Sequence, residues 1–136
     1  MRVLVFGGSW VLGRLVAEDC ISRGIDVTVF NRGRSPASLP GEVRHIRGDR
    51  KLDEDLRALA RSGPWDAVLD ISGKIPAVVR RSVRALVDVA DRYVSVSTVM
   101  AYQDWPHAPV DEDSPVWDGD PDYDPGAYTW DPDTYG

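Results

Sequence analysis

The chain has 136 residues, 43% of them hydrophobic, which is enough for one compact domain with a sizeable core and too few for two. No run of apolar residues is long enough to span a membrane, and Met1-Arg2 leads directly into an apolar segment. We therefore expect neither a membrane partner nor a signal peptide, and a cytoplasmic location follows as the default. The single cysteine, Cys20, is interpreted as a small core residue.

The net charge of -6 is unevenly distributed along the chain. Residues 1–103 hold all 16 Lys and Arg against 12 Asp and Glu, whereas residues 104–136 hold 10 acidic residues and no Lys or Arg. The basic residues are spread over the predicted helices and loops, with no clustered or aromatic-interleaved stripe. Nucleic acid is therefore not an expected partner, and no metal site is assigned.

The first 32 residues carry the clearest pattern. The apolar run Val3–Phe6 predicts a strand and is followed by a glycine-containing turn, Gly7-Gly8-Ser9-Trp10-Val11-Leu12-Gly13. Apolar residues then recur at helical spacing and predict a helix that buries Leu12, Leu15, Val16, Cys20 and Ile21, with Gly24 as its C-cap. A second apolar run, Val27–Phe30, predicts a strand that ends at Asn31-Arg32.

This order of strand, glycine turn, helix and strand is how an open parallel sheet receives a dinucleotide. Glycine lets the chain reverse tightly and lets backbone N–H groups approach a pyrophosphate, and Gly13 permits close packing of helix on strand. The helix N-terminus then directs free N–H groups at the phosphates. The alternative is a strand–turn–helix with no ligand, and Trp10 departs from the general motif, which has glycine at that position.

Strand and helix patterns alternate through the following residues. Val43–Ile46 predicts a third strand, Ala67–Ile71 a fourth and Tyr93–Val99 a fifth. Between them, Leu52, Leu56, Leu59 and Ala60 predict one buried helix face, and Val79, Val83, Leu86, Val87 and Ala90 predict another after Pro76. With right-handed crossovers, the prediction is an α/β, Rossmann-like, doubly wound parallel sheet with strand order 3-2-1-4-5.

Residues 104–136 lose this periodicity. Pro, Asp, Trp, Tyr and Gly dominate, and three of the five tryptophans lie here: Trp105, Trp117 and Trp130. We divide the chain into a dinucleotide-binding domain, 1–103, and an acidic, aromatic-rich loop, 104–136. A loop of this length and composition is expected to pack on a substrate, a partner or further chain.

These patterns resemble the N-terminal part of an extended short-chain dehydrogenase/reductase, in the NAD-dependent epimerase/dehydratase group. The resemblance covers Met1 to Gly136 and is closest to a reductase-like branch in which the first turn has the sequence G-G-T-x-F-x-G-R. The corresponding residues here run from Gly7 to Arg14, and that branch also lacks the middle glycine, which accounts for Trp10.

The resemblance implies a nicotinamide cofactor and names its contacts. They would be the turn residues Gly7, Gly8, Ser9, Trp10, Val11, Leu12 and Gly13, with Asn31 and Arg32 at the tip of the second strand, Asp49 and Arg50 after the third, and Ile71, Ser72 and Gly73 after the fourth. Because an arginine can pair with a 2′-phosphate, Arg32 favours NADP, with NAD as the alternative. Arg32 could equally be a solvated loop residue and Asp49 a simple turn residue.

The resemblance also implies catalytic residues. Thr98 would hydrogen-bond the substrate oxygen, with Ser97 as the neighbouring alternative, and Tyr135 would be the general acid/base. Tyr128 is a weaker candidate, because Pro132 stands where its lysine should be. The family's lysine would follow four residues after Tyr135, beyond Gly136, so we expect the fragment to be catalytically incomplete.

Two functional hypotheses follow. The first is an NAD(P)-binding domain of a reductase or an epimerase/dehydratase-type oxidoreductase, acting on a small carbonyl or carbinol compound such as a sugar nucleotide. The second is a non-catalytic NADP-binding regulatory or interaction module. The sequence leaves two further interpretations open, that the chain is a natural truncation or that it is the product of a decaying gene. The resemblance also implies a homodimer as a partner arrangement, because members of the family often form one.

Overall fold

A computed structural model describes residues 1–8, 11–34, 41 and 43–123. Its centre is a five-stranded parallel sheet with strand order β3-β2-β1-β4-β5, which confirms the predicted order. The strands are β1 (Arg2–Phe6), β2 (Asp26–Asn31), β3 (Arg44–Arg47), β4 (Ala67–Asp70) and β5 (Tyr93–Ser95). The helices are α1 (Val11–Ser22), α2 (Asp53–Arg61) and α3 (Pro76–Leu86), and a short 3-10 helix, η1, spans Val99–Ala101.

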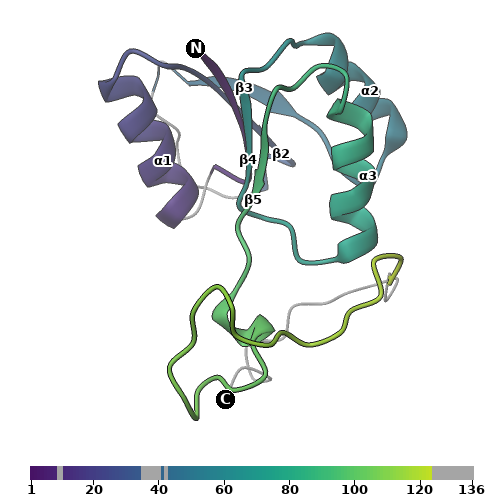
Figure 1. Ribbon diagram of the computed structural model, residues 1–136. Coiled ribbons are helices and arrows are strands. Elements are labelled where there is room, and N and C mark those ends of the chain that lie inside the picture. Colours follow the sequence, from purple (N-terminus) through teal and green to yellow (C-terminus); the bar gives the residue numbers. More distant parts are fainter. Residues whose placement is uncertain (9–10, 35–40, 42, 124–136) are drawn as a thin grey trace.

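The helices form a layer on each side of the sheet, with α1 on one face and α2 and α3 on the other (Figure 1). Side chains alternate across the strands, so Leu4 and Phe6 of β1 point to the α2/α3 side while Val3 and Val5 point to the α1 side. Each face has its own apolar core, one with Leu56, Leu59 and Leu86 from the helices and the other with Ala17 and Cys20. Cys20 is buried, as expected.

Helix α1 buries a different stripe from the predicted one. Gly13, Ala17 and Cys20 face the sheet, whereas Leu12 and Leu15 are 47% and 57% exposed. The reason is that α1 approaches the sheet closely at Gly13, so the side of the helix that carries residues 13, 17 and 20 packs against the strands. Leu12 and Leu15 lie beside this contact and stay in solvent. The prediction was therefore wrong for Leu12 and Leu15.

Helix α3 is rotated relative to the predicted face in the same way. Leu86 is buried as predicted, but Val83 and Val87 are exposed, and Val78 and Ser82 are buried in their place. Ser82 is buried because its hydroxyl donates to the Val78 carbonyl oxygen and accepts from Arg50. A polar residue with internal partners thus occupies a position that hydrophobic spacing assigned to the surface. On α2, Leu56 and Leu59 are buried as predicted and Leu52 is exposed.

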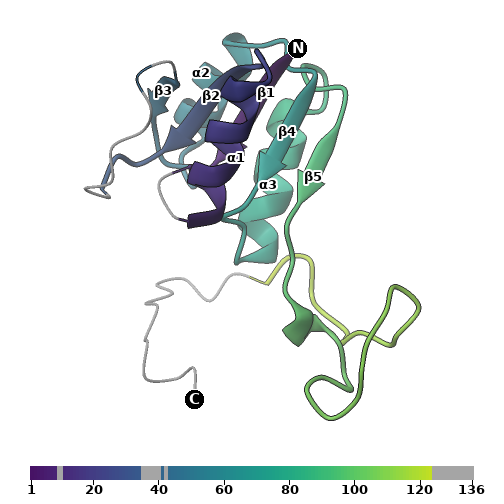
Figure 2. The same ribbon diagram turned by 90° about the vertical axis from the view of Figure 1, so that its left-hand side faces the viewer.

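The fifth strand is shorter than the predicted Tyr93–Val99. It ends at Ser95 because its neighbour β4 ends at Asp70, and the bond from the Val96 N–H to the Asp70 carbonyl oxygen, at 2.9 Å, follows directly after it. The chain then leaves the sheet and runs into a separate lobe that includes η1 (Figure 2).

Residues 104–123 contain neither a helix nor a regular strand. A single antiparallel bridge joins Tyr102 to Val116, and an ion pair between Arg80 and Asp122 ties the segment to α3. Trp105 and Trp117 are both exposed. Within the described part of the chain, no helix has the length and apolar character needed to cross a membrane.

Candidate functional site

The turn follows β1, the central strand, which pairs with β2 on one side and with β4 on the other, so the order in which strands are added reverses here. Gly7 has a φ of 96°, and its N–H donates to the Phe30 carbonyl oxygen at 3.1 Å. A Cβ on Gly7 would lie 2.8 Å from the Ser72 Cβ, and one on Gly8 would lie 2.5 Å from a Val29 methyl. Neither position has room for a side chain.

Gly13 completes the steric restriction of this turn. A Cβ there would meet two backbone atoms, the Gly7 oxygen and the Gly8 Cα, each at 2.8 Å. The first turn of α1 is thereby held directly over the end of β1, with Val11 and Leu12 exposed beside it. Ser9 and Trp10 lie outside the described residues. A dinucleotide placed here would meet backbone N–H groups and the N-terminal end of α1.

The tip of β2 presents Asn31 and two arginines. The Asn31 Oδ1 accepts from the Gly33 N–H at 2.7 Å and lies 2.9 Å from the His45 Nε2, which fixes the orientation of the amide. Burial, and to a smaller extent the charge of Arg47, lowers the pKa of His45. Arg32 and Arg34 are both exposed at this tip.

The segment after β3 is anchored to β2 and α2. The Gly48 N–H donates to the Asn31 carbonyl oxygen at 3.0 Å, and the Asp49 N–H donates to Asp55 Oδ2 at 2.7 Å. The Asp49 Oδ1 accepts from the Lys51 N–H at 3.0 Å and so closes a local turn.

The segment after β4 lies against the glycine turn. The Ile71 N–H donates to the Phe6 carbonyl oxygen at 3.3 Å, and the Ser72 N–H donates to Asp70 Oδ1 at 3.2 Å. Gly73 lies so close to α3 that a Cβ would be 2.6 Å from a Val79 methyl. Ile71, Ser72 and Gly73 thus lie at the same edge of the sheet as the turn after β1.

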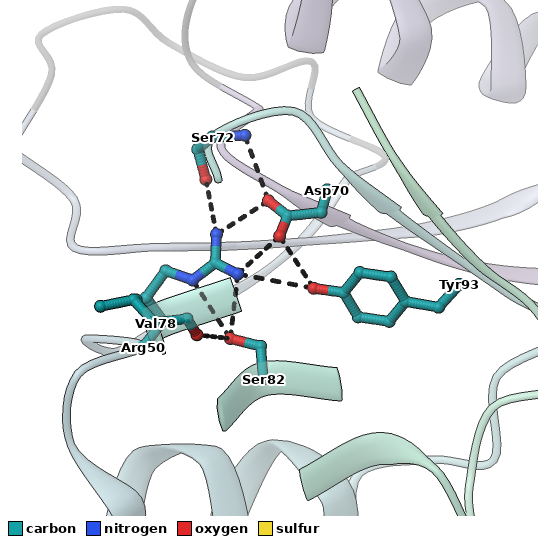
Figure 3. Close-up of polar contacts among 6 residues, drawn as sticks. All are labelled: Arg50, Asp70, Ser72, Val78, Ser82 and Tyr93. Carbon is teal, nitrogen blue, oxygen red and sulfur yellow. Dashed lines mark hydrogen bonds and ion pairs between the residues drawn. The ribbon is translucent and has the colours of Figure 1, made fainter. Parts of the chain in front are cut away.

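A buried polar network lies beneath these loops (Figure 3). The Arg50 guanidinium contacts Asp70 through two hydrogen bonds, at 2.8 Å to Oδ1 and 2.5 Å to Oδ2, and also donates to the hydroxyl of Ser82. The Asp70 carboxylate is fully buried and accepts a further hydrogen bond, at 2.8 Å, from the Tyr93 hydroxyl. The guanidinium carbon also lies 4.7 Å from the centroid of the Phe6 ring.

Sequence reasoning missed Asp70, Ser82 and Tyr93 as members of this network. The available signal was Asp70 itself, a carboxylate near the end of an otherwise apolar central strand. A buried charge requires a partner of opposite sign, so an arginine from a neighbouring loop could have been sought.

Tyr93 provides a pH prediction. Burial, followed by the charge of Asp70 and the hydrogen bond to it, raises the pKa of Tyr93 well above its usual range. Above pH about 10 the unfolded chain loses this proton while the folded chain keeps it, so the free energy of unfolding falls as the pH rises. We expect the free energy of urea unfolding to fall less steeply with rising alkaline pH for Tyr93→Phe than for the unmodified chain. If the free energies of the two proteins fall in parallel as the pH rises, this assignment is contradicted.

The catalytic candidates are only partly described. Thr98 precedes η1, and its Oγ1 accepts from the Met100 N–H at 3.3 Å, so this hydroxyl caps the short helix. Thr98 follows β5 and is well separated along the chain from the glycine turn. Tyr135 and Tyr128 lie outside the described residues.

The comparisons with known proteins agree with this architecture. No family model matches the chain. It is 37% identical over 112 residues to 2'-dehydrokanamycin reductase of Streptomyces kanamyceticus, covering 82% of this chain and 32% of that protein. It is 28% identical over 114 residues to the chloroplast stem-loop binding protein of 41 kDa b of Arabidopsis thaliana, covering 74% of this chain and 30% of that protein. The chain therefore spans about a third of the length of the curated relatives it matches.

Solved structures give the same fold. The Bordetella bronchiseptica enzyme WbmG, solved in complex with NAD, superposes with a TM-score of 0.70 at 20% identity, covering 90% of this chain and 45% of that one. A UDP-glucose 4-epimerase superposes with a TM-score of 0.62 at 16% identity, covering 76% of this chain and 37% of that one. One curated relative is thus named as a reductase, and the two solved structures, one of them named as an epimerase and the other solved with NAD, share the fold of this chain.

Proposed function

We propose that this chain, as a relative of epimerase- and dehydrogenase-type Rossmann proteins, is the NAD(P)-binding domain of an oxidoreductase-type protein. The observation that carries the proposal is the turn at Gly7, Gly8 and Gly13. Its three glycine positions exclude any side chain, and it lies under the N-terminal end of α1 where the strand order reverses. This is the place at which open parallel sheets bind dinucleotides.

The proposal extends to the other predicted contacts. Val11 and Leu12 flank the first turn of α1, Asn31 and Arg32 lie at the adenosine end, Asp49 follows β3, and Ile71, Ser72 and Gly73 pass beneath the dinucleotide. Ser9 and Trp10 belong to the same proposed site through the resemblance alone.

For the activity of the whole protein we propose reduction or oxidation of a small carbonyl or carbinol compound, with a sugar nucleotide as one class of substrate. A relative is named as a reductase, and WbmG has also been solved with both NAD and UDP. The bound dinucleotide would supply or accept a hydride at its nicotinamide. In this chain Thr98 would hold the substrate oxygen and Tyr135 would exchange its proton, the latter with a lysine four residues further along.

Titration of the purified chain with NADPH and with NADH tests the proposal. Circular dichroism of the same preparation before the titration establishes that the fold is intact. We expect saturable binding of at least one dinucleotide. If neither binds at millimolar concentration to a chain with native circular dichroism, the proposal is wrong.

We further propose that the site prefers NADP, because Arg32 and Arg34 are exposed at the tip of β2, where the 2′-phosphate would lie. We expect Arg32→Asp to weaken NADPH binding by about tenfold or more while leaving NADH binding unchanged or tighter, since a charge-assisted pair is replaced by repulsion. Arg61→Asp, at the C-terminal end of α2, makes the same charge change away from the site and is the control. Equal weakening of both dinucleotides by Arg32→Asp would contradict the assignment.

The alternative of a non-catalytic regulatory module is not favoured, because similar proteins include those named as a reductase and an epimerase. The Arabidopsis relative is named for binding a stem-loop, which is a property of that protein.

A further inference from the structure

We propose that Arg50 and Asp70 are positioning residues of the dinucleotide site, acting through Ser72 and the glycine turn and not through contact with the dinucleotide. The inference rests on the proposed function and deepens it. The inference gives Arg50 an indirect role in the dinucleotide site, in place of the direct contact with the dinucleotide that the resemblance implies.

The first argument is that every nitrogen of the Arg50 guanidinium has an acceptor inside the protein. Nε donates to Ser82, Nη1 to Asp70, and Nη2 to Asp70 and Ser82, at distances between 2.5 and 3.1 Å. The side chain is only 12% exposed and packs against the Phe6 ring. A direct contact with a phosphate would require this buried arrangement to break.

The second argument is that Asp70 connects this arginine to the wall of the glycine turn. Its Oδ1 accepts both the Arg50 Nη1 and the Ser72 N–H, at 2.8 and 3.2 Å. Ser72 in turn fills the space where a side chain on Gly7 would lie, its Cβ 2.8 Å from that position. The carboxylate therefore determines where Ser72 stands, and Ser72 determines the room available at Gly7.

The third argument is that the same network joins three of the four loops proposed to hold the dinucleotide, all except the tip of β2. Arg50 follows Asp49 in the β3–α2 loop, Ser72 belongs to the β4–α3 loop and contacts the β1–α1 turn, and Ser82 lies on α3. The Tyr93 hydroxyl adds β5 through its bond to Asp70. One buried ion pair thus sets the relative positions of these loops, and preorganised loops bind more tightly than loops that must order on binding.

The test is a double variant, Arg50→Met/Asp70→Leu, in which apolar side chains of similar size replace the pair. Such replacements often preserve folding, so the network is removed without leaving a buried charge. We expect a cooperative thermal transition near that of the unmodified chain, NADPH binding weaker by about tenfold, and faster exchange of the Ser72 amide hydrogen. The matched control is Arg23→Met/Asp19→Leu, which removes an exposed ion pair at the C-terminal end of α1 and is expected to change none of the three.

Asp70→Asn separates an indirect role of Arg50 from a direct contact with the phosphates, because it keeps the size of the Asp70 side chain and removes its charge. Under the proposal it weakens NADPH binding, because an amide has one acceptor oxygen and no charge and therefore holds Arg50 and Ser72 less firmly than the carboxylate does. If Arg50 contacts the phosphates, the same variant frees the guanidinium, and binding becomes tighter and more sensitive to salt. That result, or unchanged binding by a folded double variant, overturns the inference and leaves the proposed function standing. Absence of binding by the unmodified chain instead overturns the proposed function.

Discussion

Gly13→Ala is expected to destabilise the chain and to abolish saturable dinucleotide binding, even though alanine is the better helix former. In an exposed helix the exchange would stabilise by about 1 kcal/mol. Here the new Cβ would stand 2.8 Å from the Gly7 oxygen and 2.8 Å from the Gly8 Cα. Both are backbone atoms of the turn, so neither can swing aside as the end of a flexible side chain could.

The helix must therefore move away from the strand or the turn must change shape. Overpacking of this kind costs about 1–3 kcal/mol, which exceeds the gain in helix propensity. Either movement displaces the N–H groups that the proposed site directs at the pyrophosphate. The loss of binding should consequently be larger than the loss of stability alone would produce.

Urea unfolding and NADPH titration of the same preparation measure the two effects separately. Gly119→Ala is the control, because a Cβ at Gly119 meets nothing within 4 Å. We expect the control to match the unmodified chain in both measurements. A Gly13→Ala chain that is more stable and still binds would show that the turn adapts and that its glycine is not required for the site.

The strand order and the position of the glycine turn could be predicted from the sequence because both depend on local patterns. Strands buried on both faces, such as β1 and β2, have nearly continuous apolar runs. Right-handed crossovers then leave few ways to arrange five parallel strands. The turn at Gly7 and Gly8 follows β1 directly, so its place at the edge of the sheet was implied by chain order alone.

The helix faces could not be predicted to the residue. On α1 a glycine and an alanine lie closest to the sheet and two leucines do not, because close approach favours small side chains. On α3 the buried line includes Ser82, whose burial depends on Arg50, 32 residues earlier in the chain. The spacing of hydrophobic residues does not indicate hydrogen-bond partners of this kind, because only the tertiary fold brings them together.

The same reason applies to Arg50, for which the resemblance implies a direct contact with the dinucleotide while the structure turns its side chain toward Asp70 and Ser82. Its position after Gly48-Asp49 resembles a cofactor-binding segment, and nothing in the local sequence indicates that its side chain turns inward. The inward path becomes evident only when Asp70, Ser82 and Tyr93 are brought around it by three different elements.

The single variant Arg50→Met is expected to be the most destabilising substitution in this network. It leaves the fully buried Asp70 carboxylate without its cationic partner, with only the Tyr93 hydroxyl and the Ser72 N–H as donors among its described contacts. Breaking a buried pair from one side costs about 3–5 kcal/mol, a large fraction of the stability of a small domain. The loss arises from the uncompensated charge that remains and not from the attraction that is removed.

The comparison of this single variant with Arg50→Met/Asp70→Leu separates those two contributions. Because the double variant buries no charge, its free energy of unfolding should return most of the way to that of the unmodified chain. Urea unfolding at neutral pH measures all three proteins under one condition. If the double variant were as unstable as the single one, the attraction and geometry of the pair would account for the loss. If it recovers, the ion pair contributes little net stability, and its burial beneath the glycine turn is better explained by the positioning of Ser72 than by the need to hold the fold together.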